Sequence, residues 1–145
     1  MIKIVGYRKE DKDGVIDLVS KTLFEIFGSK PKNIEDLDKI EEEYFQKNGI
    51  FYVAKENGKI VGTIAVKEES GRARLKRIYV DKDYRGKEVG QKLLNKIIEF
   101  SKRKGYRKII TSTSPKMKAG IEFYKKNGFK KIKKEKDRIF FELTF

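Results

Sequence analysis

The sequence contains neither cysteine nor histidine, and each absence excludes a class of chemistry. Without cysteine the chain forms no disulfide bond, binds no metal through a thiolate and has no cysteine nucleophile. Without histidine it lacks the commonest general base and the commonest metal-binding side chain. We therefore expect no metal centre. Any catalysis must use carboxylates, tyrosine, lysine, hydroxyl groups, backbone amides or water.

Long hydrophobic runs are also absent, and the apolar residues after Met1 give way to polar ones within a few positions. A membrane-spanning helix needs about 20 consecutive apolar residues, and a secretory signal needs an apolar segment near the start of the chain. Because neither pattern is present, the sequence favours a cytoplasmic protein without a membrane partner.

Charge, by contrast, is abundant and mostly of one sign. The 145 residues include 36 lysines and arginines against 22 aspartates and glutamates, a formal net charge of +14. Residues 82–145 hold 20 of the basic and 7 of the acidic side chains, so almost all of the excess lies there. This bias predicts an anionic partner, either a nucleic acid or a small molecule with several phosphates. A lysine-rich solubilising surface of the thermophile type explains the same composition.

The hydrophobic spacing predicts one folded domain over residues 1–145. A first strand of about six residues is expected around Ile2 and Ile4. Further strands are expected near 50–56, 59–67, 72–80 and 107–113, helices near 15–27, 34–44, 89–104 and 115–127, and a hairpin over 129–145. Asn57-Gly58 is expected to form the turn between two of these strands, and Gly28 and Gly105 to end two of the helices. Asn33 is expected to cap the second helix and Pro115 to open the fourth. The βαβ unit over 72–113 requires a parallel pair of strands. The expected fold is a layered α/β (α+β) architecture, with a mixed, mostly antiparallel sheet of about seven strands, a central parallel βαβ pair and helices on both faces.

A strand-to-helix junction after Val80 combines glycines with basic side chains in the segment Arg85-Gly86-Lys87-Glu88-Val89-Gly90-Gln91. Glycine allows the backbone to approach a ligand closely, and the unpaired N–H groups of a first helical turn attract a pyrophosphate. The segment has neither the Gly-Lys-Ser/Thr of a Walker A loop nor the Gly-x-Gly-x-x-Gly of dinucleotide sites. It therefore predicts a phosphate-binding loop of another kind.

This junction resembles the phosphate loop of the GNAT superfamily of acetyl-CoA-dependent N-acetyltransferases, whose pattern is Arg/Gln-x-x-Gly-x-Gly/Ala. Arg85 and Gly90 match its first and last positions, and Leu75–Val80 is similar to the family's fourth strand. A second landmark, a helix ending in Tyr-x-x-x-Gly-Phe, resembles Phe123-Tyr124-Lys125-Lys126-Asn127-Gly128-Phe129. The predicted order of elements agrees with the family over the whole chain.

The resemblance implies that acetyl-CoA is the co-substrate and lies between the fourth and fifth strands. It implies that the strand backbone at Ile78, Tyr79 and Val80 contacts the pantetheine arm and the thioester carbonyl. The pyrophosphate is expected on the backbone of Arg85, Gly86, Lys87, Glu88, Val89, Gly90 and Gln91. An amine then attacks the thioester directly in a ternary complex, with Tyr124 as general acid toward the CoA thiolate.

The acceptor implied by the resemblance is an amine of a small molecule or a protein. The acidic segment 35–43, in a nearly neutral N-terminal part, slightly favours a cationic acceptor. The protein is expected to be a monomer or a homodimer.

Three residues depart from the family pattern. Glu88 stands in place of the first loop glycine, Met117 in place of a common asparagine, and Arg74 in place of a strand glutamate that serves some relatives as general base. No general base is therefore assigned. These departures leave open an acyl-CoA sensor without turnover. The interleaved aromatic and basic side chains of 123–129 leave open a nucleic-acid-binding module, which the absence of a helix-turn-helix or RNA-binding motif disfavours.

Overall fold

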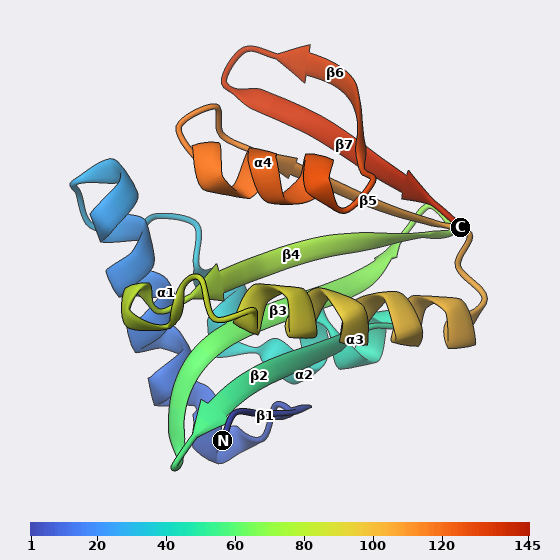
Figure 1. Cartoon of the computed structure of the whole chain (residues 1–145). Helices are drawn as coiled ribbons and strands as arrows, with labels where there is room; N and C mark the ends of the chain where they lie inside the picture. The colour runs from blue at the N-terminus through green and yellow to red at the C-terminus, as the bar shows by residue number, and fades with distance from the viewer.

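Seven strands form one mixed sheet in the order β1-β2-β3-β4-β5-β7-β6 (Figure 1). The computed structural model describes residues 1–145. Its strands are β1 (Lys3–Gly6), β2 (Ile50–Glu56), β3 (Lys59–Glu69), β4 (Arg72–Val80), β5 (Lys108–Thr113), β6 (Lys130–Glu135) and β7 (Arg138–Thr144). Neighbouring strands are antiparallel, except for the parallel pair β4 and β5 in the middle of the sheet. The predicted sheet is confirmed.

Four α-helices cover the two faces of the sheet (Figure 1). They are α1 (Lys12–Phe27), α2 (Ile40–Glu43), α3 (Val89–Lys104) and α4 (Lys118–Lys126). A cluster of 16 buried residues packs α3 and α4 on one face, and a cluster of 9 packs α1 and α2 on the other. Val53 and Ala54 belong to different clusters, because neighbouring side chains of a strand point to opposite faces. None of the helices has both the length and the apolar character needed to cross a bilayer.

Local sequence signals set most of the element ends. Asn57 and Gly58 have φ angles of 51° and 81°, so they form the left-handed two-residue turn that joins β2 to β3. Gly28 ends α1 at φ 68° and Gly105 ends α3 at φ 92°, both in the conformation that glycine adopts without a Cβ penalty. The predictions for these turns and helix ends are confirmed.

The helix predicted over residues 34–44 is broken into short turns. A 3₁₀ turn over Glu35–Asp38 precedes α2, and Lys39 between them is non-helical, with φ −145° and ψ 54°. Asn33 makes no side-chain cap and has a left-handed backbone with φ 59°. The side chain of Asp36 is held by Arg77, 41 residues farther along the chain, and such a long-range bond is invisible to local periodicity.

The helix predicted from Pro115 begins instead at Lys118. The Ser114 hydroxyl accepts a hydrogen bond from the Lys116 N–H at 3.2 Å, and the Ser114 carbonyl accepts one from the Met117 N–H at 3.0 Å. These bonds form a turn that competes with the first turn of a helix. Met117, with ψ 64°, is therefore the N-cap of α4 rather than a helical residue.

Candidate functional site

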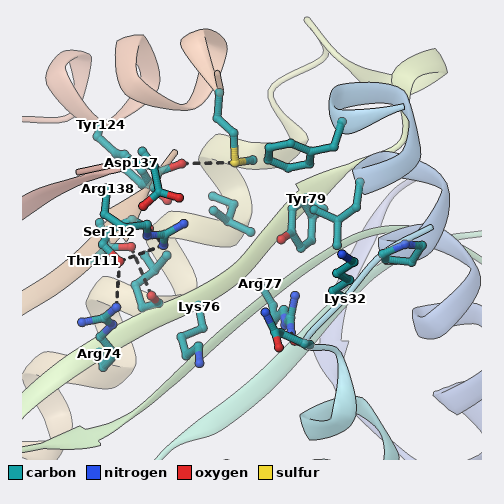
Figure 2. Close-up of a pocket in the computed structure, with 18 of the residues that line it drawn as sticks. Lys32, Arg74, Lys76, Arg77, Tyr79, Thr111, Ser112, Tyr124, Asp137 and Arg138 are labelled. Atoms are coloured by element: carbon teal, nitrogen blue, oxygen red, sulfur yellow. Dashed lines mark hydrogen bonds between the residues drawn. The ribbon is translucent and has the colours of Figure 1, made fainter. Parts of the chain in front are cut away.

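A cavity opens where β4 and β5 separate. Only two residue pairs join these strands, Ala73 with Ile109 and Arg74 with Ile110. Beyond them β4 pairs with β3 alone and β5 with β7 alone, which leaves a cavity of about 730 Å³ between the strands. Its lining consists of Leu23, Phe27, residues 29–33, residues 74–79, residues 111–113, Met117, Tyr124, Asp137 and Arg138 (Figure 2).

A β-bulge changes the course of β4 inside this cavity. Thr63 pairs with Tyr79 and Ala65 with Lys76, so two residues of β4 face one residue of β3. The first of the two, Arg77, has φ 59°, a conformation that costs about 1–3 kcal/mol in a residue with a Cβ. The Thr63 hydroxyl donates to the Arg77 carbonyl at 2.8 Å. The bulge therefore re-aims the backbone of β4 beside the cavity.

The Arg77 guanidinium ties this bulge to the segment before α2. It donates to both oxygens of Asp36, at 2.7 and 3.1 Å, and to the Asn33 carbonyl at 2.7 Å. The Tyr44 hydroxyl donates to the same carboxylate. Burial alone raises the pKa of Asp36, but the hydrogen bonds from Arg77 and Tyr44 outweigh it and hold this pKa below its ordinary value. The bond to Asn33 therefore joins Arg77 to the cavity wall formed by residues 29–33.

Tyr124 projects from α4 toward the cavity (Figure 2) and is only 4% exposed. Its ring packs against Phe129 and Phe141, at centroid distances of 5.2 and 5.7 Å. Burial raises the pKa of the Tyr124 phenol to about 12, although the Thr111 hydroxyl opposes this effect. This pKa lies above the ordinary tyrosine value of 10.0. The phenol is protonated at neutral pH and offers a hydrogen-bond donor inside the cavity.

The loop from Arg85 to Gln91 follows the end of β4 and lies outside the cavity lining. Gly86 and Glu88 have left-handed backbones, with φ 77° and 64°, and the Glu88 side chain caps no amide of α3. The first bond of α3 runs from the Lys92 N–H to the Glu88 carbonyl, at 3.0 Å. The N–H groups of residues 89–91 are therefore free to bind an anion.

The basic side chains of this loop have different surroundings. The Arg85 guanidinium donates to the Val80 carbonyl at 3.0 Å and to Glu25 at 3.3 Å, so it fastens the loop to β4 and α1. The Lys87 ammonium lies 5.4 Å from the centre of the Tyr84 ring. Both Lys82 and Lys87 are exposed and form no ion pair shorter than 4.0 Å. These two lysines are available to an anion at the loop.

The structure brings only part of the predicted site into the cavity. Ile78, Tyr79 and Tyr124 line it, as do the two departures Arg74 and Met117. Val80 ends β4, Arg85–Glu88 form the adjacent loop, and Val89, Gly90 and Gln91 form the first turn of α3. No group of three or more carboxylates is arranged to hold a metal ion.

Basic residues of the cavity wall were missed by sequence reasoning. Lys76 and Arg138 line the cavity together with Ser112, and residues 35–43 do not line it. The lining has one carboxylate against six basic side chains, which does not support a cationic acceptor. Strand alternation in the sequence could have placed Lys76 on the same face as Arg74. The approach of Arg138 to the cavity depends on the pairing of β5 with β7, which the sequence alone does not reveal.

Comparison with known proteins establishes the family. Residues 47–131, more than half of the chain, match the Acetyltransferase (GNAT) domain. The chain belongs to the GNAT acetyltransferase family. This GNAT domain is 32% identical over 105 residues to the probable N-acetyltransferase camello of Xenopus tropicalis, a match that covers 70% of this chain and 48% of that protein. The chain spans about half or less of the length of most curated relatives it matches.

Solved structures agree along nearly the whole chain. A GNAT-family acetyltransferase from Staphylococcus aureus Mu50 is 30% identical, with a TM-score of 0.92 and 99% of both chains covered. The PaiA N-acetyltransferase of Thermoplasma acidophilum, solved in complex with coenzyme A, is 23% identical with a TM-score of 0.84, and 100% of this chain and 99% of that chain are covered. The predicted GNAT fold is confirmed.

Proposed function

We propose that this GNAT domain is an N-acetyltransferase that moves acetyl from acetyl-CoA to an amine by direct attack in a ternary complex. The observation that carries the proposal is the split between β4 and β5, which holds a buried tyrosine hydroxyl and leads to a loop with free amides. The PaiA enzyme, which has the same fold, was solved with coenzyme A.

The residues present fit coenzyme A as a co-substrate. Its pyrophosphate is assigned to the free N–H groups of residues 89–91, with Gly86 allowing close approach and Lys87 adding charge. Its pantetheine arm is assigned to the edge of β4 over residues 78–80, which β5 leaves unpaired. A backbone N–H beside the bulge, at Ile78 or next to it, is assigned to the thioester carbonyl.

The proposed reaction forms a C–N bond and breaks a C–S bond. The neutral amine attacks the thioester carbon, the carbonyl oxygen gains negative charge, and the CoA thiolate leaves as the tetrahedral intermediate collapses. Tyr124 donates its hydroxyl proton toward the sulfur, the nitrogen of the new amide loses its extra proton to water, and water returns a proton to the Tyr124 phenolate. Because the pKa of Tyr124 is about 12, full proton transfer requires a sulfur desolvated in the same cavity.

The first experiment measures binding and turnover separately. Calorimetric titration with acetyl-CoA should give saturable binding at concentrations up to about 1 mM, the upper end of common KM values. A thiol reagent should then detect CoA release over a panel of amines. Binding without release would favour the sensor over the enzyme. Absence of binding would contradict the proposal, and salt-sensitive binding of DNA or RNA would then favour the basic binding module.

Replacing Glu88 with glycine should tighten acetyl-CoA binding several-fold. The change removes a carboxylate from the loop assigned to the pyrophosphate and supplies the residue that its left-handed backbone favours. The relief of about 1–2 kcal/mol of backbone strain is offset by about 0.5–1 kcal/mol of extra freedom in the unfolded chain. The free energy of unfolding should therefore rise by no more than about 1.5 kcal/mol.

Glu88→Gln separates the two contributions, since it removes the charge and keeps the backbone strain. We expect it to give most of the gain in acetyl-CoA affinity and little gain in stability, measured by titration calorimetry and urea unfolding. Weaker acetyl-CoA binding by both variants would show that the carboxylate supports the loop rather than opposing the phosphates.

A further inference from the structure

The basic side chains of the cavity lie on one face of the split sheet. Leu75 of β4 belongs to the core under α3 and α4. Its neighbours Arg74 and Lys76 therefore point to the opposite face, toward α1 and α2. On β5, Ser112 lies between the buried Thr111 and Thr113 and points the same way as Arg74, to which it is bonded. Figure 2 shows these groups around one end of the cavity.

Two arginines from different elements meet at Ser112. Nη2 of Arg74 and Nη2 of Arg138 both donate to the Ser112 hydroxyl at 2.8 Å. Nη2 of Arg138 also donates to the Ser112 carbonyl at 2.9 Å. One uncharged serine is therefore the shared partner of two cations, and the remaining guanidinium N–H groups can donate to a second partner.

These cations are poorly neutralised. Neither Lys76 nor Arg138 has a carboxylate oxygen within 4.0 Å, and Arg74 has only the exposed Glu69 at 3.5 Å. Arg77, by contrast, is neutralised by Asp36 at 2.7 Å. Burial and the nearby charges of Lys67, Arg77 and Arg74 lower the pKa of Lys76, although Asp36 opposes them. Arg74, Lys76 and Arg138 thus form an electropositive wall of the cavity. All three cations attract an anion that binds there.

The phosphates of coenzyme A do not account for this positive wall. Arg74 stands where β4 and β5 part, whereas the phosphate loop begins after Val80, six residues farther along the strand. At about 3.3 Å per residue, the two ends of that segment lie at most about 20 Å apart, because the bulge at Arg77 shortens it. The wall is therefore left for an anionic group other than these phosphates.

We propose that the acceptor is an amine that carries a carboxylate, which Arg74, Lys76 and Arg138 bind while the amine faces the thioester. This inference rests on the proposed acetyl transfer and names its substrate class. Guanidinium groups suit a carboxylate because they offer two parallel N–H donors. The product is an N-acetylated carboxylate, whose anionic group takes no part in the bond changes.

Matched amines test the inference. The rates with 4-aminobutyrate and β-alanine are compared with those of their carboxamide counterparts, 4-aminobutanamide and β-alaninamide, which carry no carboxylate, and with the diamine 1,4-diaminobutane. A charge-assisted hydrogen bond changes affinity by about 10- to 100-fold. We expect kcat/KM for at least one carboxylate to exceed that of its amide at least about 10-fold, and to exceed that of the diamine.

Single substitutions test whether the preference for carboxylates arises at the cavity wall. Lys76→Gln should raise KM for the preferred carboxylate by about 10-fold or more, with little change in kcat, in KM for the amide or in acetyl-CoA affinity. Lys131→Gln, which removes one positive charge from the exposed strand β6, should change none of these values. Lys76→Glu should shift the preference toward the diamine.

The outcomes separate this inference from the proposed function. Acetyl transfer to the amides or the diamine as fast as to the carboxylates would overturn the inference and keep the transferase. Calorimetry of the CoA-loaded protein with the carboxylates gives a second readout. Carboxylate binding that is lost in Lys76→Gln, without acetyl transfer to any amine, would support the anion site and overturn the enzyme. Neither binding nor transfer would overturn both.

Discussion

Replacing Tyr124 with phenylalanine should lower kcat for acetyl transfer by about 10²- to 10⁴-fold, the contribution of a positioned general acid. The substitution keeps the ring contacts with Phe129 and Phe141 and removes only the hydroxyl that faces the cavity. Without that hydroxyl, the CoA thiolate leaves with neither a proton nor a hydrogen-bond donor. Because Tyr124 is not assigned to the phosphates, acetyl-CoA affinity should change by less than about 3-fold.

A matched control is Tyr106→Phe. Tyr106 is 9% exposed, and its hydroxyl donates to the Asn48 carbonyl at 2.7 Å, away from the cavity. This variant should lose about 1 kcal/mol of stability with its hydrogen bond and keep its kcat. CoA release is measured for both proteins under single-turnover conditions. A kcat for Tyr124→Phe within about 3-fold of the wild type, well short of the effect of a general acid, would show that the acid lies elsewhere.

The pH dependence gives an independent check on Tyr124. A general acid loses activity as the pH rises through its pKa. With the pKa of Tyr124 at about 12, its phenol remains protonated throughout the pH range in which turnover is measured. We therefore expect no loss of kcat between about pH 8 and 10, where an unperturbed phenol begins to titrate. A decline centred near pH 10 that disappears in Tyr124→Phe would show that the phenol is better solvated than its burial indicates.

The sequence predicts those parts of the fold that depend on local signals. The turn at Asn57-Gly58, the end of α1 at Gly28 and the parallel β4–β5 pair follow from turn chemistry, glycine and the βαβ rule. The resemblance to the GNAT family predicts that residues at the end of β4 and on α4 belong to the functional site. These signals locate Ile78 and Tyr124, which both line the cavity.

Other features depend on contacts between distant segments, which no local pattern contains. Residues 35–43 have helical spacing, but the bond from Arg77 to Asp36 joins positions 41 residues apart. The bulge at Arg77 is equally hidden, because neither its residue type nor its neighbours favour a left-handed backbone. The meeting of Arg74 and Arg138 at Ser112 requires the register of three strands. The electropositive wall therefore arises from the order and register of the strands, not from a local sequence pattern.

The ion pair between Arg77 and Asp36 gives the prediction with the largest expected effect on stability. The two side chains are only 10% and 13% exposed. Removing one partner of such a pair leaves the other charge buried without compensation, at a cost of about 3–5 kcal/mol. We therefore expect Asp36→Ala to lower the free energy of unfolding by about this amount in urea titrations at pH 7. The exposed pair Arg103 and Glu99 serves as control, and Glu99→Ala should cost less than about 1 kcal/mol.

Acid titration distinguishes the charge of Asp36 from its packing. Its pKa is lower in the folded protein than the ordinary value of 3.8, so the folded state favours the ionised carboxylate. This contribution is fully present above the unfolded pKa and is lost as the pH falls through the folded pKa. The stability difference between wild type and Asp36→Asn should therefore be constant between about pH 5 and 8 and shrink below about pH 4.

A double-mutant cycle with Arg77→Met and Asp36→Ala then measures the coupling between the two side chains. Because each single substitution strands the partner charge, the double variant should be more stable than the sum of the two losses predicts, by at least about 1 kcal/mol. Additive losses would mean that the two side chains act on stability separately. The left-handed bulge at Arg77 would then be held by the Thr63 hydroxyl and the β3 ladder alone. In that case Thr63→Val, which removes the hydroxyl and keeps the shape of the side chain, would lose more activity than Asp36→Ala.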